Sequence, residues 1–553
     1  MNRLMACLAA GAFVFGVSGA VNAQAAVPAA SDVPPRVVIA PPADDLARTI
    51  KADLSAAYYG AKPDSRGYAD AQKLYYFYGA RGFEPLWIVK GADGKVSFSP
   101  NAEKIIDVFK DATAEGFRPS DYLTPNLDVN AAGSDPAKLA ALETAFSAST
   151  LRYAQNAYGG RIAPASVSSY LAIAPHRLDA SDTLLKLASS QTPDQVLHDL
   201  DPKDREFVAL KAELAKLNGN TAADAVVVPD GPLLKAGMTD DRVAILRKRL
   251  DVAAPADATA ETALIYDPAL VDAVKAFQTS LGLTADGHIG PATVAALNGS
   301  SGISKDDVIA NMERWRWMPS DIGTFHVLVN IPEFRLYVVD NDAVTYTTRV
   351  VVGKPTTQTP IFSDQIEDIV VNPYWNVPAS IVNNEIAPKL ASNPGYLASQ
   401  NMELLSGAKV INASAIDWST VTPGKFPFAV RQKPGASNAL GAIKFIFPNP
   451  MDIYLHDTPS KSLFVRDFRA FSHGCVRVQN PMDFADALLK AEPNLDSAKL
   501  KAMAGPTEKW VPLKNHVPVH LAYFTLRVDP DGTIRSFGDV YGHNKKLIKL
   551  LDE

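Results

Sequence analysis

Hydrophobic positions along the chain follow two different spacings, one before and one after about residue 323. In the first part, apolar side chains recur every three or four residues, as at Ile105, Val108 and Phe109, which predicts helices. From Gly323 on, apolar and polar positions alternate, and this period of two predicts strands. The alternating segments are "FHVLVNI", "FRLYVVD", "YTTRVVVG", "DIVVNPYW", "AIKFIFP" and "HLAYFTLRVD". We therefore expect a multidomain α+β protein, mostly helical in its N-terminal part and β-rich in its C-terminal part.

Turn residues and changes of spacing divide the chain into successive units. The expected units are a helical scaffold at 45–228, a small helical bundle at 229–300, a β-rich domain at 301–545 and a C-terminal tail at 546–553. The two apolar faces of the bundle are formed by Val243, Leu246 and Leu250 and by Val271, Val274, Phe277 and Leu281. In the β-rich domain, Asp531-Gly532 is expected to turn a terminal hairpin.

An insertion interrupts the strand pattern between residues 374 and 440. Here the alternation stops, and "SIVNNEIAPKLASNPGYLASQNMELLSG" indicates helices or loops. Because functional loops are often carried between the strands of a rigid domain, we expect this insertion to be a lid over a site.

An aromatic cluster lies in the scaffold region, in "LYYFYGARGFEPLW" at 74–87. Such a cluster could stack on sugar rings, but aromatic side chains at helical spacing more often form a core. We expect the core.

The N-terminus has the pattern of an export signal. One early cation, Arg3, precedes an apolar run and small residues that end at Ala23, which predicts a signal peptide over 1–23. A membrane anchor is disfavoured because the run is shorter than the ~20 residues that a spanning helix needs. Residues 24–44 are rich in Pro and Ala and are expected to form an extended linker. We see no further candidate membrane span, so the mature protein is expected to be exported and free of a membrane span.

Charge excludes one class of partner. The 553 residues carry a net charge of −6, with 47% hydrophobic and 21% charged residues. Nucleic-acid-binding proteins usually present a basic face, so we expect no nucleic acid partner.

Cysteine usage draws attention to one position. If the signal peptide is removed, Cys7 leaves with it, and Cys475 is the only cysteine of the exported chain. No internal disulfide is then possible, so this thiol is either a reactive nucleophile or an inert buried residue.

Two histidines, His456 and His473, could activate this thiol by raising its thiolate fraction. In a strand, His473 and Cys475 would share a face; in a tight turn at Gly474, their backbone N–H groups could converge into an oxyanion hole. We favour the turn. Arg477 could bind a carboxylate through a two-point contact. Spacing alone favours His473 as the base. A metal site made by the cysteine and both histidines is disfavoured, because structural zinc usually has four protein ligands.

Two longer stretches resemble known families. "SHGCVR" preceded by "LHD" resembles the motif of the L,D-transpeptidases, cysteine enzymes that cross-link bacterial peptidoglycan, and the resemblance extends through "NMERWRWMP", "NIPEFRLYVVD", "VVGKPTTQTPIFSD", "NPYWNVP" and "VYGH". "AVKAFQTSLGLTADGHIGPATVAALN" resembles the peptidoglycan-binding module of cell-wall enzymes. Together they resemble the large multidomain Gram-negative form with a lid. A module that has become a spacer is the alternative for 229–300.

The resemblance implies a role for each matching residue. Cys475 would be the nucleophile and His456, in place of His473, the general base, oriented through the backbone carbonyl of Asp457. The oxyanion N–H groups would come from His473, Gly474 and Cys475. Residues expected on the substrate side are Ser472, Arg477, Tyr374, Trp375 and Asp457, although Tyr374 and Trp375 could equally belong to a hinge or core. The family implies no cofactor and no metal.

The resemblance also implies a reaction and partners. The thiol would attack a tetrapeptide stem at its third residue and release D-alanine, and the amine of a second stem would then take the acyl group to make a 3→3 cross-link. The partners would be a tetrapeptide donor and a diamino-acid acceptor in a periplasmic, wall-associated setting, and carbapenems would inhibit. Alternatives are an L,D-carboxypeptidase or endopeptidase, lipoprotein attachment to the wall, and a non-catalytic wall-binding protein.

Overall fold

The computed structural model describes residues 37–63, 66–125, 127–219, 227–280, 284–298, 303–418, 426–492 and 495–553. The expected signal peptide, most of the expected linker and Leu281 lie outside the described residues. Helical and strand-rich parts follow one another along the chain, which confirms the expected α+β multidomain class. None of the described helices is long and apolar enough to cross a membrane.

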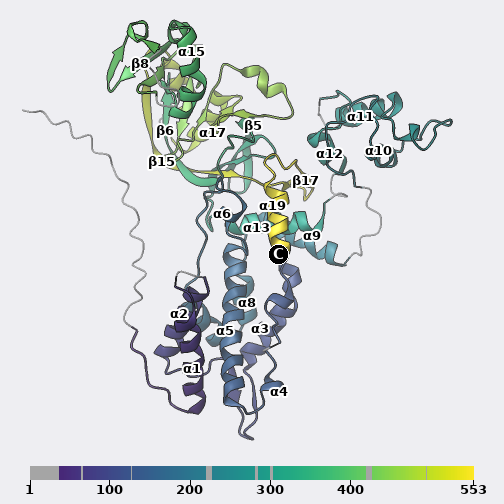
Figure 1. Ribbon diagram of the computed structural model, residues 1–553, viewed down its shortest axis with the longest axis vertical. Coiled ribbons are helices and arrows are strands. Elements are labelled where there is room, and N and C mark those ends of the chain that lie inside the picture. Colours follow the sequence, from purple (N-terminus) through teal and green to yellow (C-terminus); the bar gives the residue numbers. More distant parts are fainter. Residues whose placement is uncertain are drawn as a thin grey trace, which may run out of the picture.

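The N-terminal part is a helical bundle around the long helix α5, in the lower half of Figure 1. Its helices are α1 (Asp45–Gly60), α2 (Arg66–Ala80), α3 (Pro100–Lys110), α4 (Val129–Ala132), α5 (Pro136–Gly159), α7 (Ala180–Ser189) and α8 (Pro193–His198). The short helix α6 (Pro164–Val167) packs instead on the C-terminal part, where Val167 joins the main core. Helix α3 begins where Ser99 accepts a hydrogen bond from the Ala102 N–H and Pro100 takes the first turn, as helix starts require. A short hairpin of β1 (Ile88–Lys90) and β2 (Val96–Phe98), which the spacing did not predict, interrupts the helices.

The aromatic cluster at 74–87 lies in the core of this bundle. Its buried members are Leu74, Tyr75, Phe77, Tyr78, Phe83 and Trp87. The core interpretation is confirmed, because rings enclosed in this way offer no face to a sugar.

Helix α9 (Arg205–Gly219) falls within the expected scaffold but packs elsewhere. Its Phe207, Leu210 and Leu214 share a core cluster with residues of α13 (Lys305–Trp317) and of the C-terminal hairpin. The expected end of the scaffold at 228 therefore does not coincide with a change of packing partner. Helical spacing predicts a helix but not the surface that the helix covers.

The described residues of the range 229–298 form a small unit with a core of their own. Its helices are α10 (Arg242–Leu250), α11 (Pro268–Ser280) and α12 (Pro291–Asn298). The predicted apolar positions Val243, Leu246, Val271 and Val274 are buried in that core. Figure 1 places this unit beside the C-terminal part, away from the bundle, with α12 lying against β17 (Ile534–Ser536).

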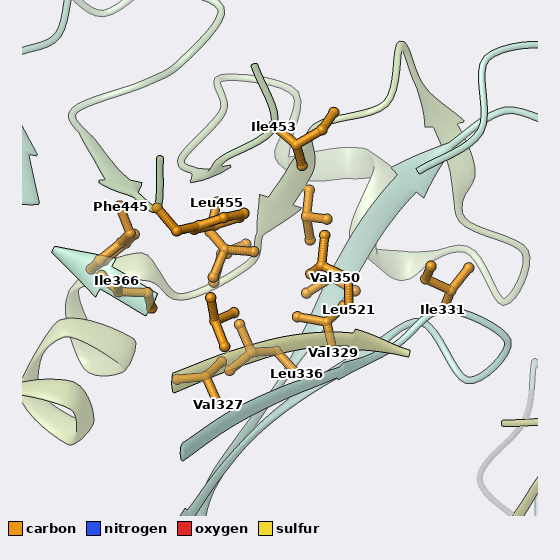
Figure 2. Packing of buried hydrophobic residues seen from close by; sticks show 14 of the residues in the cluster. Val327, Val329, Ile331, Leu336, Val350, Ile366, Phe445, Ile453, Leu455 and Leu521 are labelled. Atoms are coloured by element: carbon orange, nitrogen blue, oxygen red, sulfur yellow. The ribbon is translucent and has the colours of Figure 1, made fainter. Parts of the chain in front are cut away.

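A nine-stranded mixed sheet forms the C-terminal part. Its strands are β3 (Phe325–Asn330), β4 (Arg335–Asp340), β5 (Ala343–Gly353), β6 (Phe362–Val371), β11 (Ile443–Ile446), β12 (Leu455–His456), β13 (Ala470–Ser472), β14 (Val476–Val478) and β15 (Lys509–Ala522). The order is β13-β5-β14-β12-β11-β6-β15-β3-β4, and a further pairing of β4 with β5 closes the sheet on itself. Figure 2 shows its interior, where Val327, Leu336, Val350, Phe445 and Leu455 point toward one another.

Further helices and a hairpin complete this part. They are α17 (Pro481–Leu488), α18 (Ser497–Ala502), β16 (Leu526–Val528) with β17, and α19 (His543–Asp552). The hairpin turns at Asp531-Gly532 as predicted. The expected C-terminal tail is instead the end of α19, whose Leu547 and Leu551 are buried in the main core. The amphipathic spacing of the leucines makes this segment a packed helix, although its short length after the last strand suggested a tail.

The described residues of the insertion, 374–418 and 426–440, have their own sheet and core. Its elements are β7 (Trp375–Asn376), α14 (Ala379–Ile381), the π-helical turn η5 (Val382–Ile386), α15 (Ala387–Ser392), α16 (Tyr396–Ser399), β8 (Met402–Ser406), β9 (Lys409–Ile411) and β10 (Ala429–Gln432). The strands pair in the order β7-β10-β8-β9, so the expectation of helices and loops alone was wrong. Strands of two to five residues are too short for alternation to predict them.

Candidate active site

Sheet register brings the predicted thiol and one predicted histidine onto one face. Strands β12 and β14 run parallel, with His456 opposite Arg477. Cys475 lies two residues before Arg477 and Tyr454 two residues before His456. Because side chains alternate along a strand and register partners share a face, these four residues project to the same side.

A lysine on the next strand extends this row. Strand β11 pairs antiparallel with β12, and Lys444 lies opposite His456. Lys444, His456 and Arg477 therefore stand side by side on three adjacent strands. We call this row, together with Cys475 and Tyr454, the active face.

The loop that carries Cys475 is a bend over residues 473–475. Gly474 has φ 126°, a conformation that glycine adopts without strain, so the turn predicted from Gly474 is present. The Ser472 hydroxyl donates to the Cys475 carbonyl at 2.6 Å and accepts from the Gly474 N–H at 3.1 Å. The Gly474 N–H is thus already engaged, which contradicts its expected role as an oxyanion donor. Ser472 is buried and braces the loop instead of lining the substrate side.

Tyr454, which the sequence did not single out, is the main polar neighbour of the Cys475 sulfur. Interactions with Tyr454 act to lower the pKa of the thiol, and the Cys475 sulfur lies 3.6 Å from the Asp452 carbonyl oxygen. Burial raises the pKa of Cys475 to about 11, against the opposing effect of these Tyr454 interactions. Cys475 is therefore a neutral thiol at rest and needs a base. The only sequence signal was the position of Tyr454, two residues before His456.

His456 is buried and held in one orientation. Its Nδ1 donates to the Asp457 carbonyl at 2.5 Å, which leaves Nε2 as the proton-accepting atom of the neutral ring. Burial, with the charge of Arg477 next, lowers the pKa of His456 to about 3. The resting pair is therefore a neutral thiol and a neutral imidazole.

The Asp457 carboxylate is fully occupied within the loop. It accepts from the Ala442 N–H at 2.9 Å, the Thr458 N–H at 2.7 Å and the Lys461 ammonium at 2.6 Å. Asp457 therefore holds the loop around His456, and its expected place on the substrate side is not supported by these contacts.

His473 faces away from this arrangement, toward the insertion. Its Nε2 lies 2.7 Å from Glu385 Oε1, on η5, and 3.5 Å from the Lys354 ammonium. The preference for His473 as base, which rested on spacing alone, does not fit this geometry. Strand spacing could not reveal that an inserted segment supplies the partner of this ring.

Tyr374 and Trp375 lie half-buried at the start of the insertion. The Tyr374 N–H donates to Glu508 at 2.8 Å, and the Arg431 guanidinium lies 4.2 Å from the Tyr374 ring centre. Trp375 packs against the insertion core. Their contacts match the hinge or core alternative more closely than the cleft-lining one.

The two cations of the active face, Lys444 and Arg477, have no carboxylate in the described part of the chain that pairs with their charge. The Arg477 Nε is buried and has no hydrogen-bond partner among the described residues. Lys444 is 8% exposed, and its ammonium lies 5.8 Å from the Tyr454 ring centre and 5.3 Å from that of Trp510. Burial lowers the pKa of both groups. Lys444 and Trp510 were missed by sequence reasoning, although a lysine inside the apolar strand "AIKFIFP" was an available signal.

Comparison with known proteins gives three domain matches. Residues 324–495 match the L,D-transpeptidase catalytic domain, residues 72–214 match a scaffold domain, and residues 239–297 match a "Putative peptidoglycan binding domain". Two solved structures are similar to the chain. One is an L,D-transpeptidase from Xylanimonas cellulosilytica (18% identity, 53% of this chain and 98% of that chain, TM-score 0.17). The other is the Ldtfm-avibactam carbamoyl enzyme (12% identity, 36% of this chain and 49% of that chain, TM-score 0.15).

A curated relative is also similar. A protein of Haemophilus influenzae described as a "Putative L,D-transpeptidase" is 34% identical over 274 residues, or 48% of this chain, and the chain spans 54% of that protein's length. Cys475, His456 and Arg477 all lie inside the segment that matches the catalytic domain. The chain therefore carries a segment, residues 324–495, that matches the L,D-transpeptidase catalytic domain, together with a segment that matches a peptidoglycan-binding domain.

Proposed function

We propose that the protein is an L,D-transpeptidase that forms 3→3 peptidoglycan cross-links through a thioester on Cys475. The observation that carries this proposal is the oriented pair of the active face, in which His456 presents Nε2 on the same side of the sheet as the thiol. Both lie in the segment that matches the catalytic domain.

The first half-reaction is acylation. The Cys475 sulfur attacks the carbonyl carbon of the third residue of a tetrapeptide stem, while His456 Nε2 takes the thiol proton. The carbon–nitrogen bond to the terminal D-alanine breaks, and the proton passes from His456 to the leaving amine. A thioester and free D-alanine result. A general base is required because the thiol is neutral at rest, with its pKa raised to about 11.

The second half-reaction transfers the acyl group. The side-chain amine of a second stem attacks the thioester carbon, His456 takes a proton from this amine, and the carbon–sulfur bond breaks to restore the thiol. Attack by water in place of the amine makes the enzyme a carboxypeptidase, which uses the same residues. This is the second candidate function, and the partly exposed position of Cys475 leaves water a route. Lipoprotein attachment would differ only in the acceptor.

The oxyanion that forms in both steps is stabilised by the N–H groups of His473 and Cys475. The Gly474 N–H is excluded because it donates to Ser472. Removing one such donor typically costs 10²–10³-fold, as an order of magnitude, in turnover. The chemistry as proposed uses side chains and backbone groups alone, with no metal or cofactor.

The insertion acts as a lid that favours transfer over hydrolysis. Support comes from the Glu385–His473 contact at 2.7 Å, which joins η5 to the loop that carries the nucleophile. A closed insertion would exclude water while the thioester waits for its acceptor.

The proposed setting is the periplasm, after removal of the signal peptide at 1–23. The domain match at 239–297 supports association with the wall, and we propose that this module holds the enzyme on peptidoglycan. The proposed division is a scaffold from residue 45 to the end of α8, the wall module at 229–300 and a catalytic domain from residue 301 to the end of α19, with α9 packed on that domain. We further propose that carbapenems acylate Cys475.

Product analysis tests the function directly. Residues 24–553 are incubated with a disaccharide-tetrapeptide, and the products are measured by mass spectrometry for wild type, Cys475→Ala, His456→Ala and the matched control His473→Ala. We expect a dimer one D-alanine lighter than two tetrapeptides, lost with the first two variants and retained with the control. Tripeptide without dimer would make the protein a carboxypeptidase, and no Cys475-dependent product would overturn the proposal.

A further inference from the structure

Two cations of the active face, the buried Lys444 and the half-buried Arg477, have no anionic partner within the described chain. Neither Lys444 nor Arg477 forms an ion pair there, and neither side chain donates a hydrogen bond to a described residue. Burying a charge without a partner is costly. The presence of two such charges, one on each side of His456, therefore calls for a physical explanation.

Other buried cations of the described residues do have acceptors. The Arg527 guanidinium donates to Glu206 at 2.7 Å, and Arg316 donates to Asp201 at 3.1 Å. Arg469, which has no carboxylate, donates to four backbone carbonyls instead. The active face therefore departs from the way this chain otherwise buries positive charge.

The carboxylate whose charge acts most on Lys444 is committed elsewhere. Glu508 accepts from the Tyr374 N–H at 2.8 Å and from the Trp510 indole N–H at 3.1 Å. The Lys444 ammonium instead faces the rings of Tyr454 and Trp510, and Trp510 is 54% exposed. The Lys444 ammonium is therefore covered by two aromatic rings, one of which, Trp510, is exposed to solvent. Lys444 also lies on the same face of the sheet as the partly exposed thiol of Cys475.

The positions of the two cations match a ligand with two negative groups. Lys444 and Arg477 lie on β11 and β14, with His456 on β12 between them, so they are separated by two strand spacings, or roughly 10 Å. A tetrapeptide stem has one carboxylate on its leaving D-alanine, close to the reacting carbonyl. A second carboxylate further away must come from a neighbouring residue of the stem, and the residue at position three, which carries the scissile carbonyl, is the nearest one.

We propose that Arg477 binds the terminal carboxylate of the donor stem and that Lys444 binds a second carboxylate, carried by the side chain of the diamino acid at position three. The proposal rests on the proposed function. Arg477 is assigned to the terminal group because it lies two residues after Cys475, on the strand that follows the cysteine loop, and that carboxylate is only one residue from the scissile bond. Lys444 is thus a specificity-determining residue that distinguishes a carboxylated diamino acid from lysine.

A competing role for Lys444 is to act only on the thiol. A cation near Cys475 favours the thiolate whatever the substrate. That role predicts an equal loss with every donor, whereas carboxylate binding predicts a loss with the carboxylated donor alone. The two roles therefore differ in a quantity that can be measured.

The test compares two donors on three enzymes. The donors are disaccharide-tetrapeptides that differ only at position three, with 2,6-diaminopimelate or lysine, and the enzymes are wild type, Lys444→Met and Lys444→Arg. Rapid quenching and intact mass spectrometry give kcat/KM for acylation of Cys475. We expect wild type to prefer the carboxylated donor at least about tenfold, since a hydrogen bond to a charged group contributes about 1.5–3 kcal/mol. Lys444→Met should remove the preference by raising KM, and Lys444→Arg should retain most of it.

Each outcome decides the proposal. Equal acylation of wild type by both donors overturns it, as does an equal loss for both donors in Lys444→Met. The wild-type preference is measured without any substitution, and alkylation of Cys475 by iodoacetamide reports whether the variants retain the site. If neither donor acylates wild type while iodoacetamide still modifies Cys475, the proposed function itself fails, and this inference fails with it.

Discussion

Two of the regions in which this molecule encloses positive charge differ in what neutralises that charge. Where the bundle meets the C-terminal part, Arg316 and Lys211 are enclosed with Glu115 and Asp201, and both cations pair with both carboxylates. We call this group the junction cluster. On the active face, Lys444 and Arg477 have no carboxylate partner in the described chain. In the junction cluster, carboxylates of the chain itself neutralise the cations, whereas on the active face we assign this role to a bound ligand.

The largest expected effect is the loss of activity when the nucleophile or the base of the active face is replaced. Replacing Cys475 by Ala removes the nucleophile and should abolish thioester formation. Replacing His456 by Ala removes the base and should lower kcat/KM roughly 10²–10⁴-fold. His473→Ala, measured in the same stopped assay, should lose much less, because its ring contacts Glu385. A His473→Ala loss as deep as that of His456→Ala would reverse the assignment of the base.

The second prediction concerns stability and sets the two regions directly against each other. Arg316→Met leaves two carboxylates buried without their guanidinium and should lower the free energy of unfolding by roughly 3–5 kcal/mol. Lys444→Met removes an unpaired buried charge and should leave that free energy unchanged or raise it. Urea unfolding of both variants measures the difference. An equal loss of unfolding free energy in the two variants would contradict the claim that, of the two regions, only the junction cluster contributes to stability through its ion pairs.

The third prediction concerns pH. Burial raises the pKa of Cys475 to about 11, so the thiolate fraction should still rise through pH 9 and 10. The rate of iodoacetamide alkylation should therefore increase across this range and level off only above pH 11. The folded state keeps its proton between the ordinary thiol pKa and this raised value, so wild type should lose stability relative to Cys475→Ser as pH rises through that window. A plateau of alkylation near neutral pH would indicate a preformed thiolate instead.

The smallest expected effect concerns the insertion. Glu385→Gln removes the charge that pairs with His473 but keeps the shape of the side chain. We expect a few-fold increase in hydrolysed tripeptide relative to dimer, with the acylation rate little changed. Glu403→Gln, in the same insertion but paired with Arg431 at 2.7 Å, is the matched control. An unchanged product ratio in Glu385→Gln would leave this contact without a role in excluding water.

Much of the site was predictable from the sequence. Period-two alternation located the strand domain, and the lone cysteine with two nearby histidines located the chemistry. Resemblance then favoured His456 over His473. These inferences depend on local patterns, which a single chain displays directly.

Lys444 and the engaged Gly474 N–H were not predictable, for a different reason. Lys444 joins the active face because β11 pairs with β12 in one register, and Gly474 is engaged because Ser472 folds back within its loop. Likewise, Glu385 meets His473 across 88 residues of sequence. Such relations depend on which segments become neighbours, and this is decided by the folded sheet rather than by local spacing.

The most direct test of the central claim is the mass of the enzyme itself. Wild type is mixed with the diaminopimelate tetrapeptide donor, quenched within the first turnover and digested, and the peptide that contains Cys475 is weighed. We expect it to gain the mass of the donor less one D-alanine, and His456→Ala to gain little. An unmodified Cys475 peptide under conditions where iodoacetamide still alkylates the thiol would contradict the account.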